Sequence, residues 1–219
     1  MKKNPWLEIN ISDYVNHMSR PEVEQYGMIN ESFNYALQKY KPQNIFVPGC
    51  TIGNGFEYIE WDRVNKVTAL DINPEFLKIL GSRFPGENKL EIINKDFQDF
   101  ETDNKQYNLI FSALFFEYVA LDKALAKFKL MMDRNSVLFS IIQLPVENQS
   151  KVSDTEYKSL EKLIPFINLI SGDEFEREIN KSGLIIRFSE QKVLKNGKSF
   201  LITESFISDG ERNEHIGTQ

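Results

Sequence analysis

The spacing of apolar residues changes repeatedly along the chain from about residue 29 onward. Helical spacing, with apolar positions three and four residues apart, marks residues 29–40, 74–80 and 121–132. Short continuous apolar runs separate these segments and predict buried strands at residues 44–47, 66–72, 90–93, 107–111 and 137–142. Near-continuous apolar strands that alternate with amphipathic helices predict a parallel sheet covered by helices on both faces.

The C-terminal third of the chain has a different pattern. A capping-box pattern begins at Ser171 and predicts another helix. The turn pair Asn196-Gly197 then separates two strand-like runs, 184–194 and 199–207, and so predicts a hairpin. The whole pattern predicts an α/β fold: a three-layer sandwich whose mostly parallel, seven-stranded sheet is closed by a C-terminal antiparallel hairpin strand.

Composition and charge narrow the class of protein. The chain has 219 residues, 41% hydrophobic and 26% charged, which suits one globular domain. A single cysteine, Cys50, and two histidines exclude a disulfide framework and leave no conventional zinc site, so no metal is expected. A net charge of -6 argues against a nucleic-acid partner. Without a signal-peptide core or an apolar run of roughly 20 residues, we expect a cytoplasmic protein with no membrane partner.

A glycine-rich segment directly follows the first predicted strand. Ligands of open parallel sheets bind beyond the carboxyl ends of the strands, so this segment lies where a ligand is expected. Its glycines let the backbone approach a ligand, and a helix following it would offer free N–H groups. The segment reads Gly49-Cys50-Thr51-Ile52-Gly53-Asn54-Gly55. It matches neither the dinucleotide fingerprint nor the phosphate-binding loop, and a tight turn that binds nothing is an equally good interpretation.

Two acidic residues end the next two predicted strands. Asp71 ends the second strand, where a carboxylate can accept the two hydroxyls of a ribose. Its alternative role is to cap the helix that Asn73 and Pro74 begin. Asp96 ends the third strand and, with Phe97, could bind an exocyclic amine, or else it is a solvated loop acid. Together with the glycine segment, these strand ends predict a ligand that contains adenosine.

These segments resemble the class I S-adenosylmethionine-dependent methyltransferases. Residues 45–55 resemble motif I of that family, residues 70–74 its acidic motif and residues 95–97 its adenine-side motif. The C-terminal hairpin is similar to the family's reversed last strand, and the resemblance covers roughly residues 40–207. It implies S-adenosyl-L-methionine as the cofactor and methyl transfer as the activity.

The resemblance also implies roles for individual residues. Backbone groups of the glycine segment and of the turn after the fourth strand would hold the methionine part of the cofactor, and side chains would hold its ribose and adenine. These residues are Gly49, Cys50, Thr51 and Gly53 in the glycine segment, Ala113 and Leu114 after the fourth strand, Asp71 for the ribose, and Ile72, Asp96 and Phe97 for adenine. The chain departs from the family at Val47, usually an acid, at Thr51, usually a second glycine, and at Asn108, often an aspartate.

The N-terminal extension is a candidate lid. Residues 1–28 are similar in position to lids of related small-molecule enzymes, which would leave residues 29–208 as the binding domain and 209–219 as a flexible tail. Tyr14, His17 and Met18 are expected to contact the substrate. His17 could act as a base, because the ordinary pKa of histidine lies near neutrality, but a lone histidine is often a surface residue or a structurally satisfied one.

Polar groups after the fourth strand are candidates for acceptor chemistry. Glu117 and Tyr118 could orient an acceptor, with Phe116 beside the substrate. Alternatively, Glu117 is a surface residue at the start of a helix and Tyr118 a half-buried aromatic. The insertion at residues 146–170 is either a second substrate wall or ordinary packing.

The sequence therefore predicts S-adenosylmethionine-dependent methyl transfer to a small-molecule acceptor. The alternative is a non-catalytic protein that binds S-adenosylmethionine or S-adenosylhomocysteine, an interpretation motivated by Val47, Thr51 and the lack of an evident base. Methylation of a protein or an RNA is disfavoured by the acidic charge. The acceptor and the oligomeric state are left open.

Overall fold

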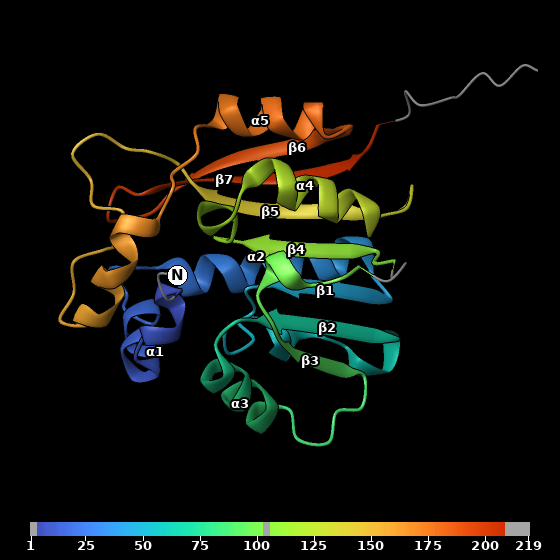
Figure 1. The fold of residues 1–219 in the computed structure, drawn as a ribbon, viewed down its shortest axis with the longest axis horizontal. Helices are drawn as coiled ribbons and strands as arrows, with labels where there is room; N and C mark the ends of the chain where they lie inside the picture. The colour runs from blue at the N-terminus through green and yellow to red at the C-terminus, as the bar shows by residue number, and fades with distance from the viewer. Residues whose placement is uncertain (1–3, 103–105, 209–219) are drawn as a thin grey trace, which may run out of the picture.

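Seven strands form one sheet in the order β3-β2-β1-β4-β5-β7-β6 (Figure 1). The computed structural model describes residues 4–102 and 106–208, so the predicted tail at 209–219 lies outside the described residues. Strands β1 to β5 pair in parallel, whereas β7 is antiparallel to both of its neighbours. The strands are β1 (Asn44–Pro48), β2 (Lys66–Asp71), β3 (Leu90–Asn94), β4 (Leu109–Ala113), β5 (Val137–Gln143), β6 (Leu184–Val193) and β7 (Ser199–Ile207).

Helices cover both faces of this sheet, as the strand pattern predicts. The α-helices are α1 (Ile11–Met18), α2 (Gln25–Tyr40), α3 (Pro74–Arg83), α4 (Leu121–Leu130) and α5 (Gly172–Lys181). One buried cluster joins α2 and α3 to Ile45 of β1, and a second joins α4 and α5 to the neighbouring Phe46. Successive strand residues point to opposite faces, so these two clusters are the two cores of a three-layer sandwich. The predicted fold class is confirmed.

Local signals in the sequence fold as expected. The Asn73 side chain accepts a hydrogen bond from Glu75 N at 2.9 Å and caps α3. The Ser171 hydroxyl accepts one from Glu174 N at 3.2 Å and caps α5. The C-terminal hairpin forms as predicted, with Gly197 in its turn at φ 81°.

The helix expected after the glycine segment is absent. Two short 3-10 turns, Phe56–Tyr58 and Trp61–Arg63, occupy that part of the chain. Gly53 and Gly55 have φ angles of 76° and 84°, a left-handed conformation that interrupts a right-handed helix. Residues 53–63 therefore offer no N-terminus of an α-helix to a ligand.

Two chain segments gather at the carboxyl ends of the parallel strands. The first holds a 3-10 turn at Pro5–Glu8 and α1, and the second is the insertion after β5, with a 3-10 helix at Lys158–Phe166. Figure 1 shows α1, in blue, beside the orange insertion at this end of the sheet. They form a cover over the sheet edge where a ligand is expected.

None of the helices in residues 4–102 and 106–208 is long and apolar enough to cross a membrane. Within the same residues, no group of three His, Cys, Asp or Glu side chains is placed to hold a metal ion.

Candidate active site

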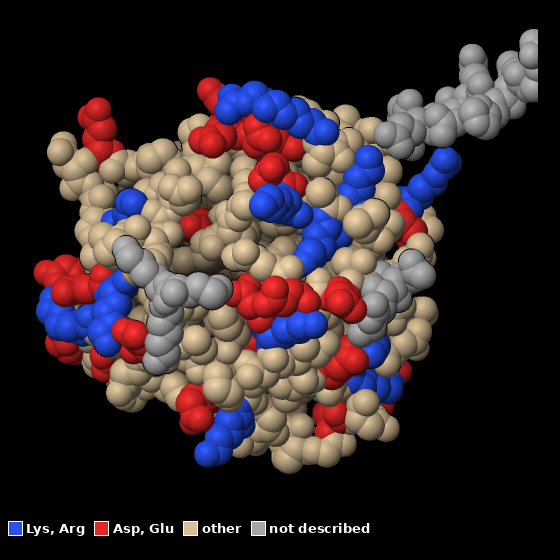
Figure 2. Space-filling view, viewed as in Figure 1, with Lys and Arg blue, Asp and Glu red and all other residues tan. Residues whose placement is uncertain are grey.

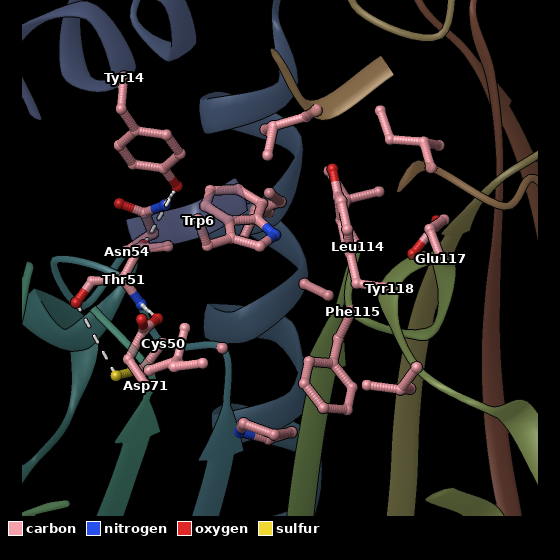
Figure 3. Close-up of a pocket in the computed structure, with 18 of the residues that line it drawn as sticks. Trp6, Tyr14, Cys50, Thr51, Asn54, Asp71, Leu114, Phe115, Glu117 and Tyr118 are labelled. Atoms are coloured by element: carbon pink, nitrogen blue, oxygen red, sulfur yellow. Dashed lines mark hydrogen bonds between the residues drawn. The ribbon is translucent and has the colours of Figure 1, made fainter. Parts of the chain in front are cut away.

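A cavity of about 180 Å³ lies between the sheet edge and this cover. Its floor comes from the carboxyl ends of β1, β2, β4 and β5, and its roof from the N-terminal segment and the insertion. Figure 3 shows Asp71 and Thr51 on one side, Leu114, Tyr118 and Glu117 on the other, and the Trp6 ring between them. The cavity therefore has two distinct walls.

The glycine segment forms much of the first wall, and Gly49, Cys50 and Thr51 line it. Gly49 has φ 62°, and a Cβ there would lie 3.0 Å from Phe115 Cδ2, so both the turn and the packing favour glycine. Burial raises the pKa of the Cys50 thiol well above its ordinary value, so this cysteine is a neutral, unreactive group.

Gly53 does not line the cavity, which corrects its expected part in holding the cofactor. A Cβ at Gly53 would lie 2.5 Å from Leu80 Cδ1, and its carbonyl accepts a hydrogen bond from the Arg83 guanidinium at 2.9 Å. This glycine lets the loop pack against α3 and has a structural role.

Asp71 is buried at the end of β2 and faces the cavity. Its carboxylate accepts hydrogen bonds from Thr51 N at 2.9 Å and from Asn73 N at 2.8 Å. Burial raises the pKa of Asp71 to about 6, although the backbone hydrogen bonds to its carboxylate act to lower it. A carboxylate has about four acceptor sites, more than these backbone donors use, so Asp71 both holds the loop and can accept another donor.

The residues expected around adenine lie together at the same end of the cavity. Ile72, Asp96 and Phe97 all line it. The Phe97 ring is buried and packs edge-on against Phe115 at 5.0 Å between centroids. Asp96 accepts a hydrogen bond from Gln98 N at 2.9 Å and remains half-buried at the rim.

Ala113 ends β4 and Leu114 directly follows it; both line the cavity, Leu114 on the second wall (Figure 3). Leu114 has φ 51°, an uncommon conformation for a bulky residue, and its N–H donates to Ile141 O at 2.8 Å. Backbone strain of this kind concentrates at functional sites. The hydrogen bond to β5 holds the turn in this form.

The N-terminal segment is tied directly to the glycine segment. Tyr14 Oη lies 3.1 Å from Thr51 Oγ1 and accepts a hydrogen bond from Asn54 Nδ2 at 3.0 Å. Farther along the same wall, Asn73 Nδ2 donates to the Trp6 carbonyl at 2.8 Å. The Trp6 ring packs against Tyr118 at 5.1 Å, so the N-terminal segment bridges both walls.

His17 and Met18 of α1 are buried and line the cavity, and His17 lies under the insertion. The Nδ1 atom of His17 is 2.9 Å from Thr155 Oγ1. Burial, aided by the charge of Lys198, lowers the pKa of His17 to about 4. A ring with this lowered pKa is uncharged at neutral pH, and its expected role as a base stays a prediction.

Glu117 is deeply buried, with 3% of its surface exposed, so it is not a surface residue. Its Oε1 accepts a hydrogen bond from Gln143 N at 2.6 Å, whereas Oε2 has no partner among the described residues. Burial raises the pKa of Glu117 to about 7. Tyr118, half-buried beside it, has its phenol pKa raised by burial and by the Glu117 charge.

Phe116 does not reach the cavity, which corrects its expected place beside the substrate. Its ring is fully buried in the second core, 5.4 Å from Phe175 and 5.7 Å from Phe128. The 3-10 turn at Phe116–Tyr118 directs Phe116 toward α4 and α5 and leaves Glu117 facing the cavity.

The sequence did not single out a second buried charged group that lines this cavity. Lys198, in the β6–β7 turn, is buried with 4% exposed and lines the cavity. Its Nζ donates to Lys151 O at 2.8 Å, and Gln143 Nε2 donates to the same oxygen at 3.2 Å. Burial lowers the pKa of Lys198 to about 8. A lysine one residue after a turn glycine looks like any solvated turn residue, so no sequence signal marked it.

Comparisons with known proteins agree with this geometry. Residues 47–140 match the family model described as a methyltransferase domain. No curated protein matches the chain. The solved structures with a similar fold include the N-methyltransferase NodS from Bradyrhizobium japonicum in complex with S-adenosyl-L-homocysteine, which has 13% identity and a TM-score of 0.69 over 92% of this chain and 96% of that one.

Two more solved structures show which activities other proteins with this fold have. Magnesium protoporphyrin IX methyltransferase (ChlM) from Synechocystis, with bound S-adenosylhomocysteine, has 11% identity and a TM-score of 0.66 over 90% of this chain and 94% of that one. The [4+2]-cyclase SpnF has 8% identity and a TM-score of 0.64 over 82% and 81%. The cofactor prediction agrees with the first of these and with NodS. Residues 47–140 thus match the methyltransferase-domain model, and the chain has the fold of the solved S-adenosylmethionine-dependent methyltransferases.

Proposed function

We propose that this protein binds S-adenosyl-L-methionine and methylates a small-molecule acceptor enclosed beneath the N-terminal segment. The observation that carries the proposal is the two-walled cavity. Asp71 and the glycine segment line one wall, and the unpartnered carboxylate oxygen of Glu117 belongs to the other. One wall thus offers groups that suit a cofactor, and the other offers a group that can accept a proton from an acceptor.

The first wall fits the cofactor. Asp71 can accept the ribose hydroxyls, and Ile72 and Phe97 offer apolar surface to adenine. Gly49 brings backbone close to the ligand, where a Cβ would meet Phe115. Val47, which also lines the cavity, supplies no carboxylate to the cofactor's ammonium group, so backbone carbonyls must serve there.

The second wall fits the acceptor. Bound S-adenosyl-L-methionine supplies an electrophilic methyl group on a sulfonium. Glu117 would accept the proton that a hydroxyl or amine acceptor loses as its lone pair forms the new bond to carbon. A carboxylate whose pKa is raised to about 7 is well suited to accept a proton near neutral pH. The cover would exclude water and hold the acceptor in line with the methyl group.

Enclosure and surface charge favour a small acceptor over a macromolecule. The N-terminal segment, here proposed as a lid, closes the cavity through the Tyr14–Thr51 contact. On the face shown in Figure 2, acidic and basic side chains are interspersed over α4 and α5 rather than gathered into one basic area. The helix α2, which begins at Gln25, runs from the proposed lid, residues 1–28, into the proposed binding domain, residues 29–208.

Calorimetric titration with S-adenosylhomocysteine tests the cofactor site, with NAD as the control ligand. We expect the first to bind and the second not to, because the glycine segment lacks the dinucleotide spacing. No heat of binding with S-adenosylhomocysteine up to millimolar concentration would refute the proposal. A structure with that ligand would then reveal the volume left for the acceptor.

A second candidate is a protein of the same fold that binds the cofactor and catalyses another reaction, or none. Val47 and Thr51 favour it, because both replace residues that usually hold the cofactor in the family. The fold likeness to a [4+2]-cyclase points the same way. Binding of S-adenosylhomocysteine without turnover of S-adenosylmethionine on any acceptor in a broad panel would support this candidate.

A further inference from the structure

Lys198 is a buried ammonium group that faces the cavity without a carboxylate partner. It is 4% exposed, and none of the described carboxylates lies within ion-pair distance of it. Its hydrogen bond goes to the neutral carbonyl of Lys151, which leaves two of its three N–H groups. Burying a cation without an anion is costly, so such a group points to an anion that arrives with a ligand.

A short polar network connects Lys198 to Glu117. The Lys151 carbonyl accepts from both Lys198 Nζ and Gln143 Nε2, and Gln143 N donates to Glu117. The two charged groups do not pair with each other: each is bound by neutral groups of this network. The second wall therefore offers one ligand both a cationic group, Lys198, and an acidic group, Glu117.

Four separate chain segments build this wall. Glu117 follows β4, Gln143 ends β5, Lys151 belongs to the insertion, and Lys198 precedes β7. The neutral ring of His17 adds a fourth side chain, close enough to Lys198 for that charge to lower the pKa of the histidine. Segments this far apart in sequence converge only because the fold holds them there, so the wall is preorganised.

We propose that the methyl acceptor is a small carboxylate-bearing hydroxyl or amine compound, whose carboxylate pairs with Lys198 while its nucleophile faces Glu117. This inference rests on the proposed function, since it names the class of acceptor for that reaction. The pairing satisfies the buried ammonium and positions the nucleophile. It also requires Lys198 to serve the acceptor and not the carboxylate of the cofactor.

The test uses simple probes in place of the unidentified acceptor. A hydroxybenzoate and an aminobenzoate, each beside its uncharged carboxamide, are added to the full chain with and without S-adenosylhomocysteine. Melting temperature reports binding, and release of S-adenosylhomocysteine from S-adenosylmethionine reports turnover. The variant is Lys198→Met, which keeps the length of the side chain. The matched control is Lys195→Met in the same turn, because Lys195 is 81% exposed and pairs with Glu24 at the surface.

The expected result is that carboxylates, and not carboxamides, stabilise the wild type in the presence of S-adenosylhomocysteine. Lys198→Met should weaken carboxylate binding by about tenfold or more, since a charge-assisted hydrogen bond is lost, while affinity for S-adenosylhomocysteine stays within about twofold. Lys195→Met should behave as the wild type.

Equal stabilisation by carboxylates and carboxamides, or by neither, would overturn the proposal. So would a loss of S-adenosylhomocysteine affinity in Lys198→Met of about tenfold, because Lys198 would then hold the cofactor. Failure of the wild type to bind S-adenosylhomocysteine would instead count against the proposed function, and the probes without cofactor would still report whether Lys198 selects carboxylates.

Discussion

Glu117→Gln should make the protein more stable above neutral pH while it impairs methyl transfer. The carboxylate is buried, and its Oε2 has no partner among the described residues, so ionisation is unfavourable in the fold. Glutamine keeps the shape and keeps an oxygen to accept the hydrogen bond from Gln143 N. The substitution therefore removes the charge and little else.

The size of the effect follows from the pKa of Glu117. Burial raises it from 4.5 to about 7, and each pKa unit corresponds to about 1.36 kcal/mol, which gives about 3 kcal/mol. Below pH 4.5 the residue is protonated in both the folded and the unfolded chain, so the charge has no effect on stability. Between pH 4.5 and about pH 7 the unfolded chain ionises first, and the wild type loses stability as the pH rises. Above pH 7 the loss is complete.

Urea unfolding across this pH range, followed by circular dichroism, measures the difference between variant and wild type. We expect the free energies of unfolding to be similar near pH 4 and to differ by about 3 kcal/mol in favour of Glu117→Gln near pH 8. Glu204→Gln is the matched control, because Glu204 is equally buried but is bound by Lys39 Nζ at 2.7 Å. That variant should lose stability at neutral pH, since Lys39 Nζ and Tyr40 Oη lose the buried carboxylate to which they donate.

Parallel curves for the wild type and Glu117→Gln would refute the reasoning, because they would show that the carboxylate is solvated in the folded chain. A stability gain together with full turnover would refute the role of Glu117 as the proton acceptor. The conclusion that its carboxylate is buried and unfavourably ionised would still hold.

Other substitutions test the first wall and the lid. Asp71→Asn should weaken S-adenosylhomocysteine binding in calorimetry by about 1–3 kcal/mol, because a charged acceptor is lost, and an unchanged dissociation constant in a folded variant would contradict the ribose role. Thr51→Gly should speed hydrogen exchange in α1, because the contact with Tyr14 is removed, and unchanged protection of α1 would show that this contact does not hold the lid. His17→Asn should leave the shape of the pH–rate profile above about pH 6 unaltered, because the ring is already neutral there; loss of a titration near pH 6.5 would contradict the lowered pKa.

Much of the fold could be predicted because its signals are local. Apolar runs marked the strands, and Asn73 and Ser171 marked helix starts through side-chain hydrogen bonds that span only two or three residues. The prediction of a helix after the glycine segment was wrong, for a reason that apolar spacing does not reveal. Left-handed backbone at Gly53 and Gly55 turns the chain instead, and both glycines are needed there for packing against Leu80 and Phe33.

The site was predictable in part for the same reason. Asp71 and Phe97 lie at strand ends, where position in the sequence implies position in the fold, and both line the cavity. The burial of Glu117 and the approach of Lys198 depend on how distant segments pack, so neither could be deduced from spacing. The pKa of His17 likewise depends on the insertion and the β6–β7 turn, which surround it with buried groups and a cation.

Thr51 connects the departure from the family pattern to the lid. Its φ of 48° is the left-handed conformation that glycine adopts without strain, so threonine strains the backbone of this turn. Its side chain, however, meets Tyr14 Oη at 3.1 Å, and its N–H holds the Asp71 carboxylate at 2.9 Å. One residue thus joins the proposed lid to the proposed ribose acceptor. Since a glycine could make only the second of these contacts, the strain at Thr51 has a physical explanation in closure of the site.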